Sequence, residues 1–241
     1  EADTVLAHEG VDGERREPEG RVIAGDPSTE TIHTEHGTRY ALDLREVMFS
    51  PGNKAERARM ADVIAGNAGP AVSPAAGTGP DAEAGPDAET DREGPERVFD
   101  MFAGIGYFTL PMARAKARVT AAEIDPDAYR LLVENARRNG VADRVRPVFA
   151  DCRTVETVAD RVVAGYYDAY EYLDSALEAL APGGVLHLHE ATPEPLFPER
   201  PLGRLTEAVE TADRTFEVLE TRTVKSHSAG VVHGVVDASI E

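Results

Sequence analysis

An apolar run that ends in an acid and enters a glycine turn constrains this sequence most. The run spans residues 97–100 and ends in Asp100, and the turn after it contains Gly104 and Gly106. A second apolar run ends in Glu123. Glycine lets a backbone pass close to a ligand where a Cβ would collide, and a carboxylate at the end of the second strand can accept hydrogen bonds from both ribose hydroxyls. The layout predicts a parallel sheet that binds a nucleotide cofactor at its edge.

The spacing of the glycines indicates which cofactor this is. The residue three after Gly106 is Thr109, so the third glycine of a dinucleotide-binding fingerprint is missing. Asp100 would repel a pyrophosphate but suits an ammonium group. S-adenosyl-L-methionine has an amino group and a sulfonium and no phosphate, so we expect it as the co-substrate. The alternative is an ordinary strand-to-helix turn that contains two glycines.

From residue 97 onward, apolar runs alternate with amphipathic segments. This pattern predicts an α/β fold with a doubly wound, seven-stranded, Rossmann-like sheet covered by helices on both faces. Because no helix separates the last two strands, we expect them to form an antiparallel pair at one edge. The predicted strands are 97–100, 118–123, 145–149, 161–165, 184–189, 215–223 and 230–238, and the predicted helices are 107–115, 126–139, 168–181 and 200–212.

The chain divides into three predicted parts. Residues 1–66 are expected to form a small α+β module, with a hairpin over 31–44 and a helix from Lys54 that buries Met60, Val63 and Ile64. Residues 67–96 consist almost entirely of Ala, Gly, Pro, Asp, Glu and Thr, a composition that predicts a disordered acidic insertion. Residues 97–241 form the predicted cofactor-binding catalytic domain.

Composition narrows the class of protein. The 241 residues have a formal charge of −19, only three lysines and a single cysteine, Cys152. An acidic, lysine-poor chain is similar to proteins of salt-loving archaea, and its charge alone does not decide whether RNA is a partner. One cysteine excludes a disulfide framework. We expect no membrane span, since no run approaches about eighteen apolar residues. The absence of a secretory leader predicts a cytoplasmic protein, although a start at Glu1 leaves an upstream segment open.

Two motifs resemble a known enzyme family. Residues 49–53 (FSPGN), followed by Glu56 and Arg57, resemble the entrance motif of archaeal and eukaryotic enzymes that modify the purine 3′ of the tRNA anticodon. Residues 100–108 resemble their cofactor loop. One branch of this family methylates N1 of guanosine. The other transfers the 3-amino-3-carboxypropyl group of S-adenosylmethionine to 4-demethylwyosine, a tricyclic base of tRNA-Phe, in wybutosine biosynthesis.

The end of the fourth predicted strand separates the branches. The methylating branch has Asn-x-Pro there, whereas residues 159–167 contain no such motif. Residues 161–166, 172–174, 187–190 and 232–237 resemble the archaeal aminocarboxypropyltransferase branch. The resemblance covers nearly the whole chain except 67–96. It implies a class I S-adenosylmethionine-dependent tRNA-modifying transferase. We expect no metal, because the positive charge of the sulfonium already activates the leaving thioether, and we expect a monomer. A tRNA guanine N1-methyltransferase and a non-catalytic RNA-binding module are the alternatives.

The motifs assign expected cofactor contacts. Glu123 binds the ribose hydroxyls, while Asp151 accepts from the adenine amino group and Cys152 offers a backbone N–H. From the entrance motif, one of Ser50 and Arg57 would donate a hydrogen bond and the other neutralise the transferred carboxylate. The alternative is that Glu123 is a solvated acid, Asp151 a turn residue, Ser50 a helix cap and Arg57 a surface arginine. Asp100 would meet the amino group or only bond the loop backbone.

Aromatic and histidine side chains are less firmly assigned. Tyr166 and Tyr167 are candidates for stacking on a flipped-out base, or are core aromatics. His187 and His189 alternate on one strand and so share a face, with Glu190 on the other. Two histidines without a third ligand are more often structural than metal-binding, so we expect no metal site. His227 and His233 receive no role.

Overall fold

The computed structural model describes residues 3–12, 17–49, 51–67 and 94–241. Ser50 and nearly all of the predicted acidic insertion, residues 67–96, therefore lie outside the described residues. Among the described residues, none of the helices has the length and apolar character that crossing a bilayer would require.

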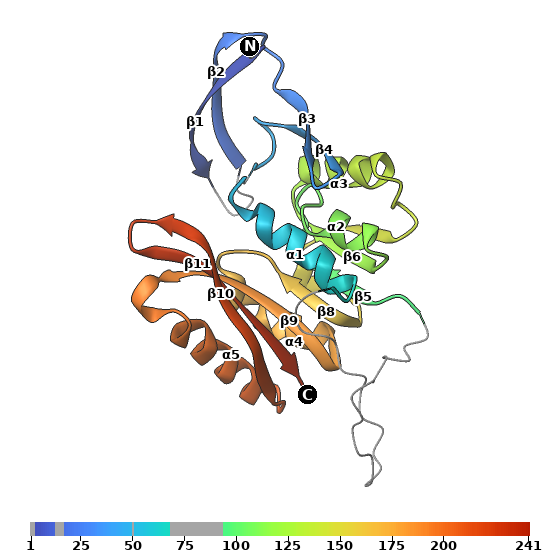
Figure 1. The fold of residues 1–241 in the computed structure, drawn as a ribbon, viewed down its shortest axis with the longest axis vertical. Helices are drawn as coiled ribbons and strands as arrows, with labels where there is room; N and C mark the ends of the chain where they lie inside the picture. The colour runs from blue at the N-terminus through green and yellow to red at the C-terminus, as the bar shows by residue number, and fades with distance from the viewer. Residues whose placement is uncertain (1–2, 13–16, 50, 68–93) are drawn as a thin grey trace.

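A seven-stranded sheet forms the centre of the molecule (Figure 1). Its strand order is β10-β11-β9-β8-β5-β6-β7, and β11 runs antiparallel to both of its neighbours while the other pairs are parallel. The predicted fold class is confirmed, and so is the antiparallel pair at one edge. The strands are β5 Arg97–Asp100, β6 Arg118–Glu123, β7 Val145–Phe149, β8 Ala159–Ala164, β9 Leu180–Pro193, β10 Phe216–Ser228 and β11 Val231–Ile240.

Helices cover both faces of this sheet and bury two separate cores. One core joins the sheet to α2 (Thr109–Arg114) and α3 (Pro126–Arg138), and the other joins it to α4 (Leu173–Ala179) and α5 (Glu199–Thr211). Asp125 begins α3 by accepting hydrogen bonds from the backbone N–H groups of residues 127 and 128, at 3.0 and 2.8 Å. This cap fixes the start of α3 close to the end of β6.

One predicted helix, 168–181, is shorter than expected. Ala169–Tyr172 form a 3-10 turn, η3, and α4 ends at Ala179, because Leu180 already begins β9. A proline at position 182 disfavours the helical conformation at Ala181, which explains the early end.

Two hairpins precede the sheet. β3 (Glu30–Glu35) and β4 (Thr38–Asp43) form the hairpin predicted over 31–44, and β1 (Thr4–Asp12) pairs with β2 (Glu17–Gly25). The β3–β4 hairpin packs on α3, where Asn135 accepts a hydrogen bond from the backbone N–H of Ala41 (2.7 Å) and donates one to its carbonyl (3.0 Å). An amide side chain thus pairs with β4 as a neighbouring strand would.

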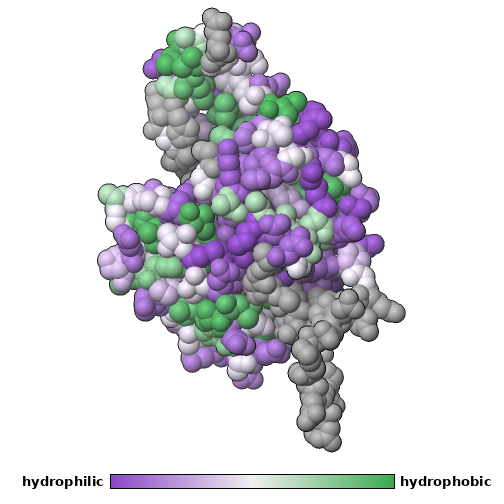
Figure 2. Space-filling view, in the orientation of Figure 1, coloured by the Kyte–Doolittle hydropathy of each residue, from purple (hydrophilic) through white to green (hydrophobic). Residues whose placement is uncertain are grey.

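The β1–β2 hairpin projects from the rest of the molecule (Figure 1). Figure 2 shows hydrophobic residues gathered at this end, and Val5 and Ile23 are 43% and 53% exposed. Hydrophilic residues cover much of the middle of the same view.

The division into an N-terminal module and a catalytic domain stays a prediction. Strand β4, from the N-terminal part, contributes to the same core as α2 and α3.

Helix α1 (Lys54–Ile64), preceded by the 3-10 turn η1 (Pro51–Asn53), lies between the hairpins and the sheet (Figure 1). It buries Met60 and Val63, as its apolar pattern predicts, and leaves Ile64 partly buried. It also buries two charged side chains, Glu56 and Arg57, at 3% and 2% exposure. Charged residues are almost never buried without partners, so Glu56 and Arg57 are candidates for a structural or functional role.

Candidate functional site

A cavity of about 170 Å³ opens at the carboxyl ends of the parallel strands. The glycine loop after β5, the segment after β6 and the segment after β7 supply most of its wall, and η1 and α1 contribute Asn53 and Arg57. Ligands of open α/β sheets bind at this edge. The lining is mostly apolar, with a few acids and one arginine among the described residues.

Glu123 ends β6 and lines this cavity. Its carboxylate accepts hydrogen bonds from the backbone N–H groups of Gly104 (2.6 Å) and Asp125 (2.7 Å). Burial raises the pKa of Glu123, and the two backbone hydrogen bonds oppose that shift. The carboxylate therefore fixes the glycine loop against the β6 end. Its predicted binding of ribose hydroxyls stays a prediction.

The two glycines of the loop have different positions. Gly104 lines the cavity, with φ of 55°. Gly106 has φ of 101° and lies behind the loop, where a Cβ would come within 2.8 Å of Cγ of Leu110. A side chain at 106 is therefore excluded by conformation and by packing against α2. Gly104 is open to a ligand, while Gly106 shapes the turn.

Asp100 does not line the cavity. It is fully buried and accepts a 2.6 Å hydrogen bond from the hydroxyl of Thr109. Burial raises the pKa of Asp100 to about 6, against the lowering effect of hydrogen bonds from Thr109 and from the backbone of Phe102. These contacts favour the second of its two expected roles, bonding within the loop, over contact with an amino group.

Asp151 and Cys152 follow β7 and line the cavity. The Asp151 carboxylate accepts from the backbone N–H of Arg153 at 2.9 Å and forms an ion pair with its guanidinium, which lowers the Asp151 pKa. Burial raises the pKa of the Cys152 thiol to about 12, so this side chain is a neutral part of the wall. The predicted contact with adenine stays a prediction.

Arg57 is the entrance-motif residue that the structure places at the cavity. Its guanidinium lies 3.9 Å from the centre of the Tyr107 ring and donates to the Glu35 carboxylate at 3.1 Å. At 2% exposure it is not a surface arginine. Since guanidinium has five donors, a ligand carboxylate can be bound in addition to Glu35. Its predicted partner Ser50 lies outside the described residues.

Three of the aromatic residues that line the cavity form a cluster. Phe102, Tyr166 and Tyr172 all line the cavity, and the Phe102 ring lies 5.2 Å from that of Tyr166 and 5.0 Å from that of Tyr172. Tyr167 does not line the cavity, and its ring packs instead on His227 (4.4 Å) and His233 (4.9 Å). Of the two predicted stacking residues, only Tyr166 therefore borders the site. Phe102 and Tyr172 stand in the motifs of the sequence but received no role there.

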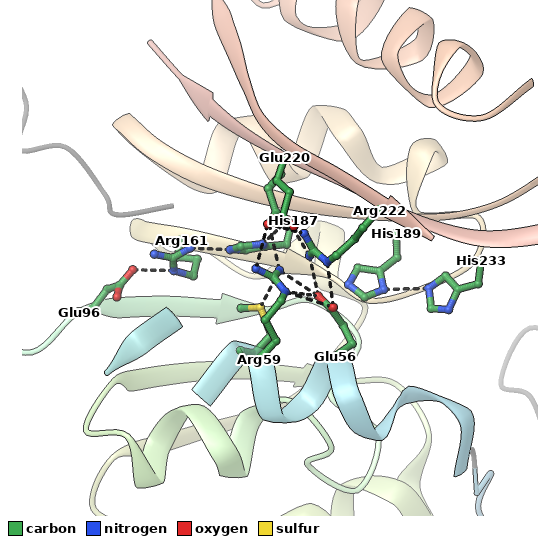
Figure 3. Close-up of polar contacts among 11 residues, drawn as sticks. Glu56, Arg59, Glu96, Arg161, His187, His189, Glu220, Arg222 and His233 are labelled. Atoms are coloured by element: carbon green, nitrogen blue, oxygen red, sulfur yellow. Dashed lines mark hydrogen bonds and ion pairs between the residues drawn. The ribbon is translucent and has the colours of Figure 1, made fainter. Parts of the chain in front are cut away.

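On the other side of α1, five residues form a buried charge network: Glu56, Arg59, His187, Arg222 and Asp237. Figure 3 shows the first four of them. The Asp237 carboxylate accepts from His187 Nδ1 (2.6 Å), Arg222 (2.8 Å) and Arg59 (3.0 Å). The Glu56 carboxylate accepts from Arg222 (2.7 Å) and Arg59 (2.9 Å). Two buried carboxylates thus face two guanidiniums, and the half-exposed Glu220 carboxylate pairs with both guanidiniums, at 3.2 Å from Arg222 and 3.8 Å from Arg59.

The histidines of β9 have structural partners. His187 donates from Nδ1 to Asp237 and meets Arg161 at Nε2 (2.6 Å), which fits the neutral ring, and burial lowers its pKa. His189 pairs with His233 of β11 at 2.9 Å. In the part of the chain that the structure describes, no cluster of three or more His, Cys, Asp or Glu has the arrangement of a metal site. A metal-free reaction stays a prediction.

Sequence comparison finds a family match and curated relatives. Residues 31–82 and 88–219 match the family described as the TRM5/TYW2 methyltransferase domain. A tRNA(Phe) (4-demethylwyosine(37)-C(7)) aminocarboxypropyltransferase of Methanocaldococcus jannaschii is 38% identical, covering 96% of this chain and 83% of the relative. The enzyme of that name from Pyrococcus horikoshii is 35% identical, covering 98% and 76%. A tRNA (guanine(37)-N(1))-methyltransferase, Trm5b of Pyrococcus abyssi, is 33% identical over 90% of this chain and 58% of its own.

Comparison with solved structures finds TYW2 and Trm5 enzymes as well. The crystal structure of M. jannaschii TYW2 in complex with AdoMet superimposes with a TM-score of 0.76 at 37% identity, covering 92% of this chain and 90% of that one. A complex of aTrm5 with tRNALeu superimposes with a TM-score of 0.78 at 27% identity, covering 99% of this chain and 61% of that one.

Proposed function

This chain belongs to the TRM5/TYW2 methyltransferase domain family, and from that premise we propose that it is a tRNA 4-demethylwyosine aminocarboxypropyltransferase. It moves the 3-amino-3-carboxypropyl group of S-adenosylmethionine to C7 of the tricyclic base at position 37 of tRNA(Phe), the reaction named for its relatives. The family match and the curated relatives confirm the resemblance of the sequence to this family. We also propose that it works as a monomer in the cytoplasm.

The observation that supports the proposal best is the position of Glu123. Its carboxylate stands at the end of β6, beside the glycine loop and within the cavity. This position suits the two hydroxyls of an adenosine ribose. Asp151 and Cys152 lie on the same wall, at the end of the next strand, where the adenine would follow. The donor and acceptor set therefore fits S-adenosylmethionine.

The choice of transferred group depends on which carbon of the sulfonium faces the nucleophile. S-adenosylmethionine supplies an activated carbon: the new bond to C7 forms as the C–S bond breaks, methylthioadenosine leaves, and C7 loses its proton. To transfer the longer arm, the protein must orient that arm toward the base. Arg57, which lines the same cavity as Glu123, is suited to bind the arm's carboxylate.

The aromatic side chains suit the other substrate. Phe102, Tyr166 and Tyr172 present rings at the same cavity wall. Recognition of single unstacked RNA bases commonly uses aromatic stacking. A tricyclic base offers a larger face than guanine, so a group of three rings is well matched to it. Residues 159–167, near this wall, also lack the Asn-x-Pro motif expected of the N1-methylating branch.

The experiment is a transfer assay with cofactor labelled separately in the methyl and carboxyl groups. The substrates are tRNA(Phe) with 4-demethylwyosine at position 37 and the same tRNA with guanosine there, in concentrated KCl. Carboxyl label in the tricyclic tRNA is expected, with no label in the guanosine tRNA. Methyl label in the guanosine tRNA would instead show an N1-methyltransferase. Absence of both transfer and cofactor binding would indicate a non-catalytic RNA-binding module.

A further inference from the structure

Helix α1 presents adjacent residues to two different regions. Neighbouring residues on an α-helix point about 100° apart. Arg57 lines the cofactor cavity, whereas Glu56 faces the buried charge network on the antiparallel edge of the sheet (Figure 3). Met60, with no exposed surface, packs one turn further along. The rotation of α1 about its own axis therefore decides where the Arg57 guanidinium lies.

Glu56 is bound on two sides. Both of its oxygens accept from Arg222 of β10, at 2.7 and 3.0 Å, in the parallel arrangement that guanidinium and carboxylate favour. Both also accept from Arg59, one turn along α1, at 2.9 and 3.2 Å. Burial would raise the pKa of Glu56, but the hydrogen bonds from Arg222 and Arg59 hold it at about 2. Glu56 is therefore a charged anchor between helix and sheet.

The anchor extends into the sheet. Arg222 and Arg59 both donate to Asp237 of β11, which in turn accepts from His187 of β9. Three neighbouring strands thus contribute to the site that receives Glu56. Ion pairs with several hydrogen bonds to rigid elements have little freedom to rearrange. The network specifies one orientation of α1 more narrowly than apolar packing of Met60 and Val63 would.

We propose that Glu56 is a positioning residue for the cofactor's aminocarboxypropyl arm. By joining α1 to Arg222, it fixes the helix rotation at which Arg57 points into the cavity. This inference rests on the proposed function, because it assigns Arg57 to the arm's carboxylate. It predicts that the network acts on binding of the arm and not on binding of the adenosine part.

The test compares two ligands by calorimetry in concentrated KCl. Methylthioadenosine has the adenosine and sulfur of S-adenosylmethionine but lacks the arm. Glu56→Gln keeps the shape of the side chain and removes its charge. We expect this variant to bind S-adenosylmethionine at least about tenfold more weakly than the wild type, with methylthioadenosine affinity unchanged.

Glu96→Gln is the matched control. Glu96 pairs at 2.7 Å with Arg161, which meets the far side of His187, so it belongs to the same group of charges without binding Glu56. Its replacement is expected to lower the melting temperature and to leave both affinities unchanged. Should Glu56→Gln fail to fold, Arg222→Lys keeps the charge, removes the bidentate geometry and is expected to give the same loss of S-adenosylmethionine affinity.

Three results would overturn the inference: unchanged S-adenosylmethionine affinity in the folded variant, equal loss of both ligands, or a wild type that does not distinguish them. None of these touches the proposed function, which the labelled-transfer assay decides on the wild type alone. Conversely, methyl transfer by the wild type would overturn the function whatever the binding data show.

Discussion

The cofactor cavity and the buried charge network lie on two sides of one helix and treat buried acids in opposite ways. In and behind the cavity, Glu123 and Asp100 are bonded to backbone N–H groups and a hydroxyl, and burial raises the pKa of both. In the network, Glu56 and Asp237 meet arginines and a histidine, which lower the pKa of both although burial opposes this. The cavity therefore has polar capacity left for a ligand, while the network uses its charges to fix structure.

The largest expected effect comes from removing Asp237 from the buried charge network. Asp237→Ala leaves Arg59, Arg222 and His187 without their shared acceptor, and losing one partner of a buried ion pair costs about 3–5 kcal/mol of unfolding free energy. Denaturant unfolding followed by circular dichroism measures it.

The control is the ion pair of Arg130 and Glu46, in which the side chains are 54% and 44% exposed. Glu46→Gln is expected to cost less than about 1 kcal/mol, because exposed pairs contribute little. Equal losses in the two variants would contradict the distinction between a buried network and a surface pair.

The network also marks the limit of what the sequence predicts. Glu56 and Arg222 are 166 positions apart, and Arg59 and Asp237 are 178 apart. No periodicity or short motif joins such residues, so the sequence leaves His187 without a partner. The predicted ranges 97–100, 118–123 and 145–149, by contrast, match β5, β6 and β7, because apolar runs bounded by turns are local signals.

The next effect concerns the cavity. Glu123→Gln keeps the size of the side chain and removes the charge that we propose binds the ribose, so we expect about a hundredfold loss of S-adenosylmethionine affinity, equivalent to about 2.7 kcal/mol. Calorimetry measures it. The single Gln oxygen can keep one of the two backbone hydrogen bonds, from Gly104 or from Asp125, so the unfolding free energy should change less than in Asp237→Ala. A variant that binds as the wild type does would remove Glu123 from the site.

The pH dependence of stability should have opposite signs in the two regions. The folded-state pKa of Asp100, about 6, lies above its ordinary value of 3.8, so its stabilising contribution is present at low pH and is lost as pH rises through that interval. Relative to Asp100→Asn, the wild type should lose about 2 kcal/mol between pH 4 and pH 7. Unfolding titrations at each pH measure this difference.

For Asp237 the folded-state pKa lies below the ordinary value of 3.8. Its contribution is therefore present above that pH and is lost as pH falls below it. Relative to Asp237→Asn, the wild type should keep its advantage from pH 7 down to about pH 4 and lose it below. Profiles of the same sign in the two comparisons would contradict the account.

The smallest expected effect concerns the aromatic side chains that line the cavity, compared with those that do not. Tyr166→Ala removes one ring from the wall, and base–aromatic stacking contributes about 1–3 kcal/mol, so KM for tRNA should rise about tenfold with cofactor affinity unchanged. Tyr170, whose ring stacks on Arg204 and does not line the cavity, is the control. A tRNA KM that is equally raised in Tyr170→Ala would show that the rings are not used for the base.

The same rings show why site prediction was partial. Tyr166 and Tyr167 are neighbours in one motif, and the sequence treats them alike. In the fold, Tyr166 faces Phe102 and Tyr172, while Tyr167 faces His227 and His233. Adjacent residues at a strand end point to different sides, so the backbone path after β8 decides which one reaches the cavity. Glu123 and Gly104 were easier to predict, since a strand end and its turn define their place locally.

A crystal structure of this protein with S-adenosylmethionine bound would show which substituent of the sulfonium faces the aromatic rings. We expect the ribose at Glu123 and the aminocarboxypropyl arm directed past Arg57 toward Phe102, Tyr166 and Tyr172, with the methyl group turned away from those rings. A structure in which the arm is enclosed by the glycine loop and the methyl group faces the aromatic wall would contradict this expectation.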